Sequence, residues 1–113
     1  MNEVLVSRSD LLPAGFILPA NNNIISRAEI AGNKARVYIP LYPEIEVGHE
    51  VSIEVWTDGE WIMLARRLVT SIDKMIEVPL LDQLFANPVT RAIVSYVVNG
   101  NNHSEKQEYT VED

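Results

Sequence analysis

Residues 51–66 read VSIEVWTDGEWIMLAR, two alternating runs of apolar and polar residues on either side of Asp58-Gly59. An Asp-Gly pair between such runs is the strongest short-range signal for a β-hairpin, because both residues of the turn must accept a positive φ. A two-residue loop also fixes the register. The predicted pairs are Thr57 with Glu60, Trp56 with Trp61, Val55 with Ile62, and Ile53 with Leu64.

This register sorts the hairpin side chains into two faces. The core face carries Val51, Ile53, Val55, Ile62 and Leu64. The other face carries Ser52, Glu54, Trp56, Trp61 and Met63. The hairpin therefore predicts a half-buried antiparallel sheet with two tryptophans pointing outward.

Alternation continues along most of the chain, and helical periodicity is confined to one short stretch. Strands are predicted at 35–41, 68–78, 90–98 and 105–111, with a short opening strand at Val4 and Val6. Pro40 predicts that the first of these ends there or forms a sheet edge. Residues 11–23 are predicted to be irregular, and Leu80–Phe85 a helical turn. About seven short strands predict an immunoglobulin-like antiparallel β-sandwich in the all-β class.

Composition limits the classes of function. The chain has 113 residues, 47% of them hydrophobic, with 16 acidic against 9 basic residues and a formal net charge of −7. A net negative charge with scattered basic residues argues against a nucleic-acid partner or an anionic membrane surface. With no cysteine, disulfide and thiolate metal sites are excluded. No apolar run reaches the ~18 residues that span a bilayer, so membrane insertion is not expected.

Several stretches resemble the immunoglobulin-like repeats found in tandem in large Gram-negative surface or secreted proteins. They are residues 35–43 (ARVYIPLYP), 47–53 (VGHEVSI), 76–79 (IEVP) and 92–98 (AIVSYVV), with Leu18-Pro19-Ala20 as a lead-in. The resemblance implies a lead-in segment at 1–16 and a sandwich domain at 17–113. It also implies a cell-surface or secreted location within a longer chain. His49 stands where the family usually has Asp, and the resemblance supplies no catalytic residue.

The search for chemistry gives no catalytic residue, metal site or cofactor. His49 and His103 lie in predicted loops without a nucleophile motif. Glu44, Glu46 and Glu50 lack the Asp-x-Asp spacing of calcium loops and are interpreted as solvated charges. We therefore expect the protein not to be an enzyme.

Trp56, Trp61 and Met63 are the candidate binding residues. Outward tryptophans stack on sugar rings or anchor protein partners. The structural alternative is a cross-strand pair that stabilises the hairpin by about 0.2–1 kcal/mol, or packing against Phe16 and Ile17. The sequence therefore favours a structural or adhesive module. The alternatives are a free-standing, cytoplasmic partner-binding protein, such as an inhibitor or chaperone-like factor, and a carbohydrate-binding module that uses the two tryptophans. The sequence does not determine the oligomeric state.

Overall fold

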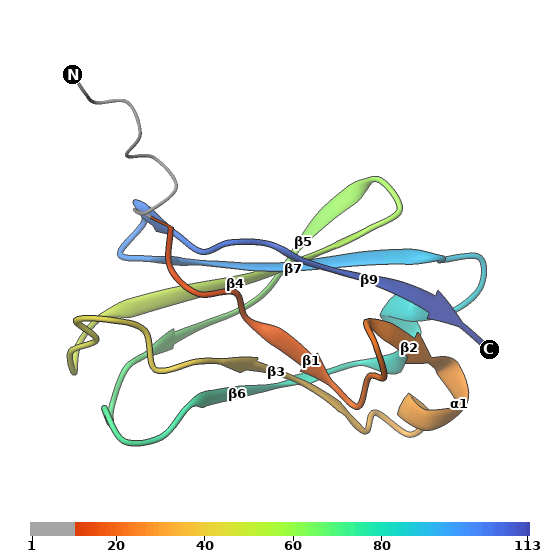
Figure 1. The fold of residues 1–113 in the computed structure, drawn as a ribbon, viewed down its shortest axis with the longest axis horizontal. Coiled ribbons are helices and arrows are strands. Elements are labelled where there is room, and N and C mark those ends of the chain that lie inside the picture. Colours follow the sequence, from red (N-terminus) through yellow and green to blue (C-terminus); the bar gives the residue numbers. More distant parts are fainter. Residues whose placement is uncertain (1–10) are drawn as a thin grey trace.

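The computed structural model describes residues 11–113, which form two β-sheets packed face to face (Figure 1). The three-stranded sheet has the order β1 (Phe16–Leu18), β3 (Ala35–Ile39) and β6 (Ile76–Leu80). The six-stranded sheet has the order β2 (Ile24–Ser26), β9 (Gln107–Glu112), β7 (Arg91–Val98), β4 (Glu50–Thr57) and β5 (Glu60–Leu68), with β8 (Asn102–His103) paired to β7. The predicted all-β sandwich is confirmed.

The connections interlock the two sheets. The chain crosses from one sheet to the other between β1 and β2, β2 and β3, β3 and β4, β5 and β6, and β6 and β7. Two short helical segments, α1 (Arg27–Ile30) and η2 (Asp82–Phe85), lie on such connections, and η2 matches the predicted helical turn. Every pairing between these strands is antiparallel except that of β2 with β9, which is parallel. The last strand, β9, therefore lies between β2 and β7 in the six-stranded sheet.

Inward side chains of both sheets form a single core. Along β7, the predicted face is confirmed, because its four residues Ala92, Val94, Tyr96 and Val98 are all buried. Burying a side chain of this kind contributes about 1.5–3 kcal/mol relative to leaving it exposed. The largest fully buried side chains are Tyr96, Phe85, Ile17, Ile25, Ile30, Ile39, Ile53 and Leu80.

Two of the predicted strands have the wrong boundaries. The strand expected at 35–41 ends at Ile39, which confirms the predicted end at Pro40. It lies between β1 and β6, so the alternative that it forms a sheet edge is wrong. Pro40 follows immediately, because a proline has no N–H to donate to the neighbouring strand. The strand expected at 68–78 is divided: β5 runs on to Leu68, a loop follows, and β6 starts at Ile76.

The segment predicted to be irregular contains β1, and β2 begins directly after it. Each has three residues, which is too short to show a period of two in the sequence. The opening strand predicted at Val4 and Val6 lies outside the described residues.

Two buried tyrosines fasten the β1 segment across the sandwich. Tyr109 of β9 accepts a hydrogen bond from the Ile17 N–H at 2.8 Å, so its hydroxyl joins the two sheets. Tyr96 of β7 donates to the carbonyl of Pro13 at 2.7 Å. Both hydroxyls thereby pair with backbone groups of a segment whose strand is only three residues long.

We predict that Tyr109→Phe lowers the free energy of unfolding by about 1–3 kcal/mol, because it leaves the buried Ile17 N–H without its acceptor. Urea unfolding followed by tryptophan fluorescence measures the loss. Tyr38→Phe is the control, since Tyr38 is half-buried and stacks on Phe16. Equal stability of wild type and Tyr109→Phe would contradict this role.

Stability should fall at alkaline pH. Burial raises the pKa of Tyr42, Tyr96 and Tyr109 above the ordinary value of 10.0, and for Tyr109 the Ile17 N–H offsets part of this effect. Above about pH 10 the unfolded chain therefore loses protons that the folded state retains, so folding stability is complete below pH 10 and declines as the pH rises. Urea midpoints at pH 8 and pH 11 test this. The decline should be smaller in Tyr96→Phe, and an unchanged wild-type midpoint would refute the prediction.

Candidate functional site

The β4–β5 hairpin carries all three candidate binding residues. Its turn has a positive φ at both Asp58 (44°) and Gly59 (123°), as expected for a two-residue hairpin loop. The predicted pairs of Thr57 with Glu60, Trp56 with Trp61, and Val55 with Ile62 are confirmed. These three pairs are sufficient to fix which face each tryptophan occupies.

The predicted pair of Ile53 with Leu64 is wrong, because Ile53 lies opposite Ala65. A bulge on β5 leaves Leu64 as an extra residue between Met63, which pairs with Glu54, and Ala65. Such a bulge bends its strand and increases the local twist.

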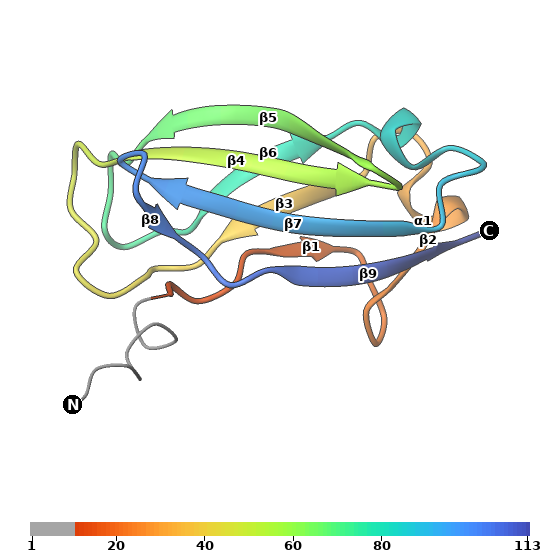
Figure 2. The same ribbon diagram turned by 90° about the horizontal axis from the view of Figure 1, so that it is seen from above.

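Trp56, Trp61 and Met63 lie on the outer face of the six-stranded sheet, which Figure 2 shows from above. Trp61 and Met63 are 45% and 48% exposed, whereas Trp56 is half-buried. Trp56 is central because it pairs with Trp61 on one side and with Ile93 of β7 on the other. The three side chains thus form an apolar surface, which we call the tryptophan face.

Two basic side chains from other parts of the chain reach the tryptophan face. The Arg91 guanidinium carbon lies 5.6 Å from the centre of the Trp56 ring, and Lys106 Nζ lies 6.0 Å from that of Trp61. Arg91 is held by Glu108, with 2.7 Å between Nε and a carboxylate oxygen. Each cation–π contact is worth about 0.5–1 kcal/mol at an exposed site. Sequence reasoning missed both cations, since each lies far along the chain from the tryptophan it contacts.

The structure excludes one predicted role of the tryptophans. Phe16 and Ile17 do not pack against them, because β1 belongs to the opposite sheet. Phe16 instead stacks on Tyr38, with ring centroids 5.4 Å apart and 15° between the ring planes, and Ile17 is buried in the core.

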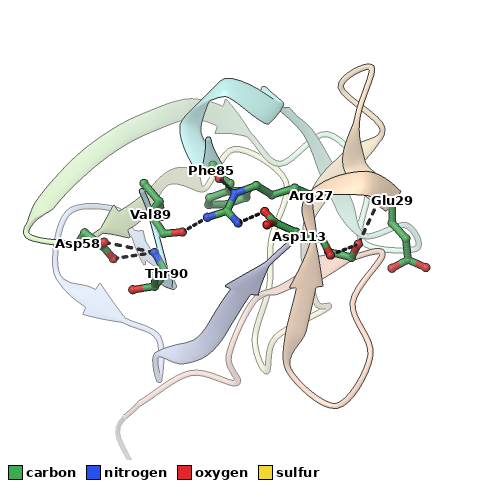
Figure 3. A network of polar contacts seen from close by, with 8 residues as sticks. Arg27, Glu29, Asp58, Phe85, Val89, Thr90 and Asp113 are labelled. Carbon is green, nitrogen blue, oxygen red and sulfur yellow. Dashed lines mark hydrogen bonds and ion pairs between the residues drawn. The ribbon is translucent and has the colours of Figure 1, made fainter. Parts of the chain in front are cut away.

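A polar network holds the hairpin end of the sandwich together (Figure 3). Arg27 donates to the carbonyls of Phe85, at 2.8 Å, and Val89, and its guanidinium contacts the Asp113 carboxylate at 2.7 Å. Asp58 accepts hydrogen bonds from the backbone N–H groups of Thr90, at 3.2 and 3.3 Å, and Arg91, at 3.0 Å. Arg27 and Asp58 thus bind backbone groups and the side chain of Asp113, so their role is structural.

A hollow of about 760 Å³ lies at the opposite end of the sandwich. Its walls include Tyr42, Glu44, Glu46 and His49. Tyr42 is buried, and its hydroxyl lies 3.0 Å from His49 Nδ1. The carboxylates of Glu44 and Glu46 belong to exposed residues, in keeping with solvated charges.

His103 and Glu50, the other polar residues considered in the sequence analysis, are not part of the Tyr42–His49 contact. His103 is exposed on β8 opposite Val97, and Glu50 is exposed at the start of β4, where its N–H donates to the Asn99 side chain. Within residues 11–113, no three His, Asp or Glu side chains gather as a metal site would require. In the same part of the chain, no helix has the length and apolar character needed to span a membrane.

We predict that Asp58→Ala lowers the free energy of unfolding by about 1.5–3 kcal/mol, because two backbone N–H groups lose a charged acceptor. Asp58→Asn should cost less, since asparagine keeps one side-chain acceptor oxygen and tolerates a positive φ. Urea unfolding of both variants measures the difference, with Asp73→Ala, at an exposed residue of the loop between β5 and β6, as control. Equal losses in the two Asp58 variants would contradict the assignment.

Comparison with known proteins gives no relative. No protein-family model matches the chain, no curated protein matches it, and no solved structure matches the fold. Its function must therefore be inferred from its own residues and their arrangement.

Proposed function

We propose that this chain is a non-enzymatic structural and adhesive module of a bacterial surface or secreted protein, of the immunoglobulin-like repeat kind. The observation that carries the proposal is the path of the chain. The chain enters the sandwich at Leu12, beside β8. The Leu12 N–H donates to the His103 carbonyl, and the Leu12 carbonyl accepts from the Glu105 N–H. Asp113 leaves at the other end of the longest axis, beside Arg27 (Figure 1).

This path suits a module joined end to end with others. When a chain enters one pole and leaves the opposite pole, consecutive copies extend along their long axes and act as a spacer. The pole at which this chain enters also exposes apolar side chains on neighbouring loops and strand ends: Leu41, Val47, Leu68, Ile72 and Met75. Hydrogen bonds of Val69 to Gly48 and His49 join these loops. A preceding module would cover such a surface.

The tryptophan face supports the adhesive part of the proposal. Trp61 and Met63 are exposed on a sheet face that the opposite sheet does not cover. Tryptophan and arginine are the residues that most often dominate the energy of binding interfaces. Trp56, Trp61 and Arg91 meet on this surface, which therefore suits recognition of a partner.

The test is an immunoblot of native cells with an antibody to this domain, combined with protease treatment of intact cells. A band far above 12.7 kDa that external protease removes would support a module of a long exported protein. A protected band near 12.7 kDa would refute it and favour a free-standing partner-binding protein.

A carbohydrate-binding role is the second candidate, and the exposed Trp61 ring favours it, because indole faces stack on sugar rings. Titration of a glycan panel should then change tryptophan fluorescence of the wild type. Isothermal titration calorimetry should find no binding of the same glycan to Trp56→Ala/Trp61→Ala, a variant that circular dichroism should show to be folded. Ile72→Ala, at another exposed apolar residue, is the matched control. A flat wild-type response across the panel would remove this candidate.

A further inference from the structure

The strand β5 forms an open edge of the six-stranded sheet. Among residues 11–113 it pairs with β4 alone and is the last strand in the sheet order, as Figure 2 shows. At nine residues it is also the longest strand of the fold. An unpaired edge of this length presents a row of free N–H and C=O groups that another strand can use.

The hairpin register tells which backbone groups face the open edge. The turn makes Thr57 and Glu60 a hydrogen-bonded pair, and antiparallel pairs alternate between bonded and non-bonded. Ile62, opposite Val55, is then bonded to β4. Trp61 and Met63 lie in non-bonded pairs, so their N–H and C=O groups point away from β4.

Neither face of β5 is fully covered. The inward residues Val51, Ile53 and Val55 of the neighbouring β4 are completely buried. The corresponding side chains of β5, Ile62, Leu64 and Ala65, are only half-buried. The reason is that the three-stranded sheet ends at β6 and is too narrow to cover the wider sheet to its edge. On the outer face, Trp61 and Met63 are exposed as well.

The charges of β5 are complementary to themselves. Glu60 lies at one end, and Arg66 and Arg67 lie at the other. In an antiparallel pair of identical strands, each acidic end lies beside the basic end of the partner, which is the relation that a two-fold interface requires. The strand carries a net charge of +1 (Arg66 and Arg67 against Glu60) in a chain of net charge −7, so two copies meet through their least acidic edge.

We propose that β5 is a homodimer interface, at which a second copy of this chain adds its own β5 antiparallel about a two-fold axis at Ile62. In this register Trp61 lies opposite the partner's Met63, both on the outer face, and their outward backbone groups form the hydrogen bonds. Ile62 meets the partner's Ile62 on the inner face. A methionine sulfur against an aromatic ring is worth about 0.3–1.5 kcal/mol. The bulge at Leu64 bends the strand beyond this central segment.

Sedimentation velocity of the full chain between about 10 µM and 1 mM tests the proposal, over the range of weak dimer affinities. The expected result is a monomer–dimer equilibrium. The charge variants Glu60→Arg and Arg66→Glu/Arg67→Glu change only exposed side chains. In this register Glu60 lies opposite the partner's Leu64, two residues from the partner's Arg66. Each variant alone should shift the equilibrium toward monomer, because it brings charges of the same sign near each other, and an equal mixture of the two should dimerise again. A wild-type chain that stays monomeric throughout would overturn the proposal.

Cross-linking tests the register. The chain has no cysteine, and paired Ile62 residues in a non-bonded antiparallel pair would have Cα atoms about 4.5 Å apart, within disulfide range. Ile62→Cys should therefore form a disulfide-linked dimer on the order of tenfold faster than Thr110→Cys, an exposed control on β9, since an associated pair holds its thiols at a high effective concentration. Circular dichroism confirms that both variants fold. Equal rates would overturn the register even if the wild type dimerises.

Discussion

The Asp58-Gly59 turn is the constraint on which the tryptophan face depends. Positive φ at both residues closes a loop of two residues, and that length allows one register for the strands that follow. A slip by one residue would exchange the two faces, placing the tryptophans in the core and Val55 and Ile62 in water. Asp58 also accepts hydrogen bonds from the start of β7, so the same residue anchors the hairpin tip to the strand that supplies Arg91.

The unequal width of the two sheets explains what remains exposed. Three strands pack against six, so the core is complete beneath β4 and β7 and incomplete at β5. On the opposite side, the switch of the chain from β1 to β2 and the Tyr109 hydroxyl close the sandwich. The molecule therefore has one sealed side and one open side. The open side is where the tryptophan face and the free strand edge meet.

Sequence reasoning succeeded where the pattern was long enough to show its period. The hairpin pairs next to the turn and the buried face of β7 follow directly from alternation. The strands β1 and β2 are too short to carry that signal, and their positions depend on contacts with β3 and β9. The bulge could have been suspected from Leu64-Ala65, two adjacent apolar residues that interrupt the alternation. Arg91 and Lys106 could not have been placed, because only the folded sheet brings them to the tryptophans.

Amide hydrogen exchange along β5, followed by NMR at a low protein concentration, tests most directly that this turn and register leave an open edge. The account predicts alternation: slow exchange at Glu60 and Ile62, whose N–H groups bond to β4, and fast exchange at Trp61 and Met63, whose N–H groups face solvent. The reverse alternation would mean that the register is displaced. Uniformly slow exchange would mean that the edge is covered by another part of the chain, and either result would contradict the account.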